Sequence, residues 1–139
     1  SLSHTRGAAL LAVHNEPIGA DIECLRPVSG AMRTRFHAAN DADFWRLWVQ
    51  RESRCKRAGI SAVALRDREV PSFPNERVFT LEPFPDYTAS VCTCSFSSYS
   101  STMMGSWCTF GSSIFLTSLV LSLMVEVQRH GWQEKYSAS

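Results

Sequence analysis

Residues 41–58 form the longest stretch of this sequence in which apolar side chains recur with the spacing of an amphipathic helix. Phe44, Leu47 and Trp48 fall at positions i, i+3 and i+4 along one face. The candidate caps are Asp41 or Asp43 at the N-terminal end and Gly59 at the C-terminal end. The pattern predicts one principal helix, around which the other elements must pack.

The remaining apolar segments are short and bounded by turn residues, which is typical of strands. They cover residues 7–14, 18–23, 60–68, 77–82 and 87–94. Asn15-Glu16-Pro17 separates the first two segments, so we expect these two strands to form a hairpin. Together the segments predict an α+β fold, an antiparallel sheet packed on one main helix, within a domain of residues 1–95.

Composition limits the classes of partner. The chain has 139 residues, of which 45% are apolar and 19% charged, and its formal net charge is +1. This balance is ordinary for a globular domain and gives no basis for binding nucleic acid or an anionic membrane. The five cysteines are odd in number and follow no regular framework. They predict free thiols and a cytoplasmic location.

Residues 96–139 form a Ser/Thr-rich apolar tail, which we treat as a separate, uncharacterised segment. No charged residue occurs from Tyr87 to Val125, and the apolar run 114–125 is shorter than the ~20 residues of a membrane-spanning helix. Three interpretations stay open for this tail. It is a membrane span, which its length disfavours, a buried or interface segment, or a sequence foreign to the domain.

Asp21 and Glu23 are the first candidate functional pair. At positions i and i+2 of a strand they leave the same face, with Cα atoms about 6.5–7 Å apart. Two carboxylates at this spacing can reach one hard cation through oxygen. The alternative is that they form the solvated face of an amphipathic strand.

Glu52 and Lys56 are neighbours at positions i and i+4 on one face of the predicted helix. In one interpretation they form a surface ion pair that contributes about 0.3–0.5 kcal/mol. In the other, Glu52 is a third cation ligand and a general base, and Lys56 faces an anionic substrate.

The segment Ser1-Leu2-Ser3-His4-Thr5 directly precedes the first predicted strand. Its hydroxyls and imidazole can donate hydrogen bonds to phosphate oxygens. Alternatively, Ser3 or Thr5 caps a turn and His4 is an ordinary surface residue.

These three pieces occur in a particular order along the chain. The order is Leu2-Ser3-His4-Thr5, then Gly19-Ala20-Asp21-Ile22-Glu23, then a helix that runs from Trp48 to Lys56. Over residues 1–94 this resembles the 4′-phosphopantetheinyl transferase superfamily, whose signature is an LSHS/T segment, a G-V/I-D-I/V-E strand and a W-x-x-K-E-x-x-x-K helix. It is most similar to the second half of the long, surfactin-synthetase-activating type. By this resemblance we expect a similar N-terminal half to be missing here.

The resemblance implies an enzyme that transfers 4′-phosphopantetheine from coenzyme A to a serine of an acyl or peptidyl carrier protein. Asp21, Glu23 and Glu52 would bind Mg²⁺ together with the coenzyme A pyrophosphate. Glu52 would act as general base toward the carrier serine, and Lys56 would pair with a phosphate oxygen and stabilise the leaving group. Ser3, His4 and Lys56 would hold coenzyme A phosphates.

Two other interpretations of the function stay open. The chain is an inactive truncated remnant or interaction module, and an apolar face exposed by the missing half would then promote self-association. The third interpretation is a different magnesium-dependent phosphohydrolase, built on the same three carboxylates. The LSHT segment and the helix motif have no role in that enzyme.

Overall fold

The computed structural model describes residues 1–61, 69–70, 72–94, 106–110, 113–117 and 124–129. The elements in chain order are β1 (Leu2–Thr5), β2 (Ala8–Val13), β3 (Ile18–Cys24), α1 (Gly30–Arg35), α2 (Asp41–Arg57), β4 (Glu76–Leu81), β5 (Tyr87–Cys94), β6 (Ser106–Phe110), β7 (Ser113–Thr117) and β8 (Met124–Arg129). The predicted segment 60–68 lies largely outside the described residues. The other strands and the main helix that the sequence predicts before residue 95 are all present.

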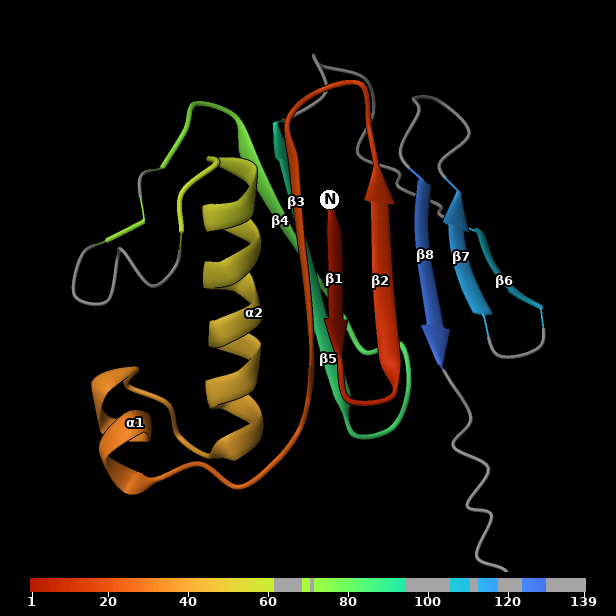
Figure 1. Ribbon diagram of the computed structural model, residues 1–139. Coiled ribbons are helices and arrows are strands. Elements are labelled where there is room, and N and C mark those ends of the chain that lie inside the picture. The colour runs from red at the N-terminus through yellow and green to blue at the C-terminus, as the bar shows by residue number, and fades with distance from the viewer. Residues whose placement is uncertain (62–68, 71, 95–105, 111–112, 118–123, 130–139) are drawn as a thin grey trace, which may run out of the picture.

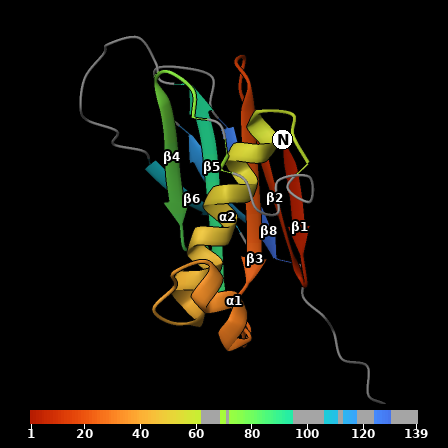
Figure 2. The same cartoon turned by 90° about the vertical axis from the view of Figure 1, so that its left-hand side faces the viewer.

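The fold is α+β, with two antiparallel sheets in place of the single sheet that the sequence predicts. One sheet has the order β3-β5-β4, and the other has the order β1-β2-β8-β7-β6. Figure 1 shows α2 on one side of the strands and β6, β7 and β8 on the opposite side. Figure 2, seen from the helix side, shows α2 lying in front of the strands.

Strand β3 lies between helix α2 and the second sheet and contacts both of them. Ala20 and Ile22 belong to an apolar cluster with Ala8, Leu10 and Ala12 of β2. Since successive side chains of a strand point to opposite faces, the residues between them face α2. Strand β5 pairs with β3 and is buried on both faces in the same way. An apolar face toward β2 and a mixed face toward α2 explain the sequence pattern of both strands.

The predicted hairpin between segments 7–14 and 18–23 is wrong. Strand β2 pairs with β1 and β8, whereas β3 pairs with β5. Leu10 of β2 and Ile22 of β3 belong to the same buried apolar cluster, so the two strands stack face to face between the sheets. Both strands are too apolar on one face to leave it exposed, and stacking buries both faces at once.

Helix α2 begins at Asp41, and its N-cap lies one residue before the first predicted candidate. Asn40 is the N-cap, and its side chain accepts a hydrogen bond from the Asp43 amide at 2.9 Å. The Asp43 carboxylate in turn accepts from the Ala39 amide at 2.9 Å, which lowers its pKa. The prediction of Asp41 or Asp43 as N-cap was therefore wrong. The side-chain oxygen of Asn40 takes this role, and asparagine is as good an N-cap as aspartate. The predicted stop at Gly59 is confirmed by its φ of 67°.

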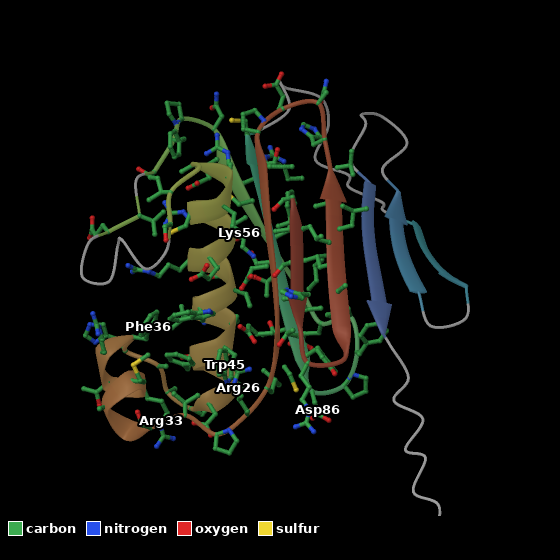
Figure 3. The ribbon with its side chains drawn as sticks, in the orientation of Figure 1. Arg26, Arg33, Phe36, Trp45, Lys56 and Asp86 are labelled. Atoms are coloured by element: carbon green, nitrogen blue, oxygen red, sulfur yellow. The ribbon has the colours of Figure 1, made fainter. Side chains whose placement is uncertain are left out.

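An aromatic cluster holds the N-terminal half of α2 against α1, a short helix that the sequence did not predict. Phe44 and Trp45 are buried, and Phe36, just after α1, meets Phe44 edge to face with ring centroids 4.9 Å apart. The Trp45 indole donates to the Arg26 carbonyl at 2.8 Å. Figure 3 shows Trp45 and Arg26 together beside the lower end of α2. The loop after β3 is thereby attached to the helix.

The segment after residue 95 contributes strands to the second sheet. Strand β8 pairs with β2 from Ala8↔Arg129 to Val13↔Met124, and β7 and β6 follow in order. Strands β6, β7 and β8 are thus joined through strand pairing to the N-terminal strands, and a boundary at residue 95 stays a prediction. Within the described residues, no helix is long and apolar enough to cross a membrane.

Gly19 sets the distance between β3 and α2. A Cβ atom at this position would overlap the backbone carbonyl oxygen of Ser53 and the backbone nitrogen of Arg57. Both obstructing atoms belong to the helix backbone and cannot rotate away as a side chain would. Only glycine lets the strand approach the helix this closely.

We expect Gly19→Ala to lower the free energy of unfolding by about 3 kcal/mol, because β3 and α2 must move apart. Urea denaturation monitored by circular dichroism measures the change. Gly30→Ala is the matched control, since a Cβ at Gly30 meets nothing within 4 Å, and it should change stability by less than about 1 kcal/mol. Equal effects of the two substitutions would contradict the close approach.

Candidate active site

Strand β1 is attached to the free edge of β3 by side-chain hydroxyls. The Ala20 amide donates to Ser1 Oγ at 3.0 Å, and the Ile22 amide donates to Ser3 Oγ at 3.4 Å. Farther along, Thr5 Oγ1 donates to Glu23 Oε2 at 2.9 Å. Because the hydroxyls occur at every second residue, all of them point toward β3. We call this row of hydrogen bonds the hydroxyl seam.

Asp21 lies at the centre of the seam, on the face of β3 that looks toward α2. Asp21 is only 5% exposed. Its Oδ1 accepts hydrogen bonds from Ser3 Oγ at 2.8 Å and from Lys56 Nζ at 2.7 Å. Lys56 Nζ also donates to Ser3 Oγ at 3.0 Å. Figure 3 shows Lys56 on the side of α2 that faces the strands. Strand β1, strand β3 and helix α2 therefore meet at one buried carboxylate.

The second oxygen of Asp21 is buried and, within the described residues, has no hydrogen-bond partner. Burial raises the pKa of Asp21, although the hydrogen bond and charge of Lys56 act in the opposite direction. An unpartnered carboxylate oxygen in a buried place is costly. The Asp21 carboxylate thus has one oxygen available to another donor or cation.

Glu23 lies two residues farther along the same face of β3 and is partly exposed. Its Oε2 accepts from Thr5 Oγ1 and from Arg26 Nη1, each at 2.9 Å. The Arg26 guanidinium is half exposed, so solvent weakens this ion pair. Glu23 is oriented by the seam on one side and neutralised by an arginine on the other.

Glu52 contributes a third carboxylate from α2, one helical turn before Lys56. Burial is the main cause that raises its pKa, and the negative charge of Asp21 is the second. Glu23 raises it further, whereas Lys56 and Arg51 lower it. Glu52 therefore lies within electrostatic range of both strand carboxylates, and its role as a third cation ligand stays a prediction. Both Asp21 and Glu52 hold their protons more tightly than isolated carboxyls do.

The three carboxylates fit a divalent cation by charge and donor chemistry. In the described part of the chain, however, their side chains do not converge into a closed group of metal ligands. Lys56 Nζ is bound to Asp21 Oδ1 and supplies a positive charge there. An added cation would partner the second Asp21 oxygen and oppose the causes that raise the pKa of Asp21 and Glu52.

The structure separates Ser3 and His4, two of the three candidate phosphate-binding residues. Ser3 is 6% exposed, and its hydroxyl is shared among Asp21, Lys56 and the Ile22 amide. His4 is exposed on the opposite side of β1. Ser3 therefore lies with the carboxylates and His4 does not.

Sequence reasoning missed the polar contact that lies beneath the site. Ser53 of α2 and Ser90 of β5 are both 0% exposed, and their hydroxyls are 3.0 Å apart. Ser53 also donates to the Gln50 carbonyl at 3.0 Å. The sequence signal for this contact was Ser53, a small polar residue on the helix face that packs on the strands. Only a short side chain fits where β3 approaches the helix so closely, and a buried hydroxyl requires a partner.

Comparison with known proteins gives no further assignment. None of the family models, curated proteins or solved structures with which the chain was compared matches it. The functional conclusion therefore depends on the residues and the geometry described above.

The ion pair between Lys56 and Asp21 should be tested by a double-mutant cycle. Lys56→Met leaves the Asp21 carboxylate buried without its counter-charge, and we expect a loss of about 2–3 kcal/mol in the free energy of unfolding. The double variant with Asp21→Asn should lose clearly less than the sum of the single variants. Arg46→Met removes a more exposed ion pair with Asp43 and should cost less than about 1 kcal/mol. Additive losses would contradict the pairing.

The pH dependence of stability tests the environment of Glu52. Because its pKa is raised in the folded state, the folded protein binds a proton that the unfolded chain releases above about pH 4. This contribution to stability is complete below that pH and is lost as pH rises through the folded pKa. We therefore expect Glu52→Gln to unfold at higher urea concentration than wild type at pH 7, and at an equal concentration near pH 3.5.

The matched control for this measurement is Glu16→Gln, which changes an exposed carboxylate in the turn after β2. It should leave the urea midpoint nearly unchanged at both pH values. A Glu52→Gln variant that is less stable than wild type at pH 7 would show that burial does not disfavour this carboxylate.

Proposed function

We propose that the chain is the magnesium- and coenzyme-A-binding half of a 4′-phosphopantetheinyl transferase. The acceptor is a serine hydroxyl of an acyl or peptidyl carrier protein, and the second product is 3′,5′-ADP. The phosphopantetheinyl-transferase-like fold class and the cytoplasmic location are parts of the same proposal. The α+β architecture and the free thiols of the four described cysteines are compatible with it.

The observation that carries the proposal is the shared electrostatic field of Asp21, Glu23 and Glu52. Both strand carboxylates raise the pKa of Glu52, and one buried oxygen of Asp21 has no partner among the described residues. Lys56 and Arg26 already pair with Asp21 and Glu23, and a divalent cation at the unpartnered Asp21 oxygen would offset the remaining negative charge. The oxygen donors of the three carboxylates are the type that Mg²⁺ prefers.

In this proposal, Asp21, Glu23 and Glu52 would hold Mg²⁺ beside the pyrophosphate of coenzyme A. When bound, the ion neutralises negative charge on the pyrophosphate as the phosphate ester is transferred. The raised pKa of Glu52 suits a general base that accepts the proton of the carrier serine.

Lys56 is the residue that would change partners during binding. Its ammonium group is bound to Asp21 and Ser3 and is about one third exposed. A phosphate oxygen at this edge would compete for the same ammonium and would be stabilised as the nucleotide leaves. Ser3 then keeps Asp21 in place through its hydroxyl. The exposed His4 would contact a coenzyme A phosphate only from the other side of β1.

The proposal is tested by incubating the chain with an apo carrier protein, coenzyme A and Mg²⁺. Mass spectrometry should show that the carrier gains one phosphopantetheine group at its serine. We expect Glu52→Gln to lower the initial rate at least ~100-fold, which is the usual contribution of a general base. Glu16→Gln, which changes an exposed carboxylate in the turn before β3, should retain the wild-type rate.

A binding measurement separates the other interpretations. Calorimetry should detect coenzyme A binding that requires Mg²⁺ and that disappears in Asp21→Asn. Binding without transfer would mean that this half needs a second half for catalysis. Neither binding nor transfer would favour the inactive remnant or interaction module, and release of phosphate from simple esters would favour a phosphohydrolase.

A further inference from the structure

A second cluster of ionisable side chains lies where the last turn of α2 packs on β4 and β5, and the proposed function does not use it. Arg57, at the end of α2, donates a hydrogen bond from Nη2 to the sulfur of Cys94, at the end of β5. The Arg57 side chain is only 5% exposed, whereas Cys94 is partly exposed. A buried guanidinium thus points at a thiol that solvent can reach.

The charge of Arg57 is incompletely satisfied by its other neighbours. Nη1 lies 3.5 Å from Glu76 Oε1, and neither Nη1 nor Nε has a hydrogen-bond partner among the described residues. Glu76 is itself shared, because its Oε2 accepts from Arg54 Nε at 2.9 Å. The ring of Phe73 covers the guanidinium at 4.6 Å. A buried cation in this condition favours an additional anion.

The other described cysteines have different surroundings. Cys92 donates its thiol proton toward Glu76 Oε1 at 3.3 Å, and burial with this contact raises the pKa of Cys92 to about 12. Cys55 is completely buried, and burial raises its pKa as well. Cys24 is partly exposed like Cys94, but its thiol faces the Leu25 carbonyl at 3.7 Å. Of Cys24, Cys55, Cys92 and Cys94, the cysteines whose side chains are described, only Cys94 accepts a hydrogen bond from a cation.

We propose that Cys94 is a thiol-modification site, whose sulfur attacks low-molecular-weight disulfides while Arg57 stabilises the negative charge on sulfur. The Cys94 thiolate attacks one sulfur of the disulfide, so that a new bond forms to Cys94 and the original sulfur–sulfur bond breaks. The other sulfur leaves as a thiolate and takes a proton from water. Cys94 is oxidised to a mixed disulfide, and one thiol of the low-molecular-weight disulfide is released in reduced form.

The site is separate from the proposed carboxylate site. Its residues are Cys94, Arg57, Glu76 and Phe73, and none of them contacts Asp21, Glu23 or Glu52 in the interactions described above. Its chemistry needs neither a divalent cation nor coenzyme A. The inference therefore stands or falls independently of the proposed transferase activity.

The test is to expose the reduced full chain to oxidised glutathione at pH 7 and to follow each cysteine by peptide mass spectrometry. Cys94 should gain glutathione at least ~10-fold faster than Cys24, because the Arg57 guanidinium contacts the Cys94 sulfur and would stabilise negative charge on it during attack. Cys24 is the matched internal control, since both residues are partly exposed and lie at strand ends. Equal rates at Cys24 and Cys94 would overturn the proposal.

Two variants test the part played by Arg57. Arg57→Met removes the charge and should reduce the Cys94 rate to that of Cys24, and circular dichroism checks that the variant is folded. Glu76→Gln removes the carboxylate that competes for Arg57 and should make Cys94 react faster than in wild type, even if Arg57→Met does not fold. A Cys94 rate that is unchanged in folded Arg57→Met, or lowered in Glu76→Gln, would refute the role of Arg57.

Discussion

The close contact between β3 and α2 at Gly19 is the constraint on which the other features depend. The strand backbone approaches the helix backbone without an intervening side chain. The next residues on the same face, Asp21 and then Glu23, are consequently held beside the helix, where Lys56 and Glu52 are found. A wider spacing would leave Asp21 without its ammonium partner. One glycine thus decides whether the acidic and basic groups of the two elements interact.

The same packing produces two polar environments along one helix. Toward β1 and β3, α2 presents Glu52 and Lys56 to carboxylates that are oriented by hydroxyls of β1. Toward β4 and β5, its last turns present Arg54 and Arg57 to Glu76 and to a thiol. Both environments place charge where solvent is limited, so each interaction is stronger than on an open surface. The apolar layer beneath β3 provides the rigid support for both.

Local patterns predicted the elements well, but they did not predict their partners. The helix from Asp41 and the strands around Ile22 and Val91 follow from spacing alone. The pairing of β2 with β8 joins residues more than a hundred positions apart, and no local pattern encodes it. The order of motifs predicts that Asp21, Glu23 and Glu52 share one cation, and this stays a prediction. The burial of Ser3 was not predictable from the sequence, because it depends on how β1 lies along β3.

The hydroxyl seam gives the molecule a mechanical property. Paired strands of one sheet are joined by a continuous series of backbone hydrogen bonds, which resist sliding together. Strands β1 and β3 are joined instead by separate hydrogen bonds to serine hydroxyls, which contribute about 1 kcal/mol each. Displacement of β1 along β3 requires the hydroxyls to rotate and the apolar packing between β2 and β3 to shift. Because Ser3 and Thr5 also hold Asp21 and Glu23, such sliding would change how many donors each acidic side chain retains. The position of one sheet is thereby coupled to the hydrogen bonds of Asp21 and Glu23 on the other.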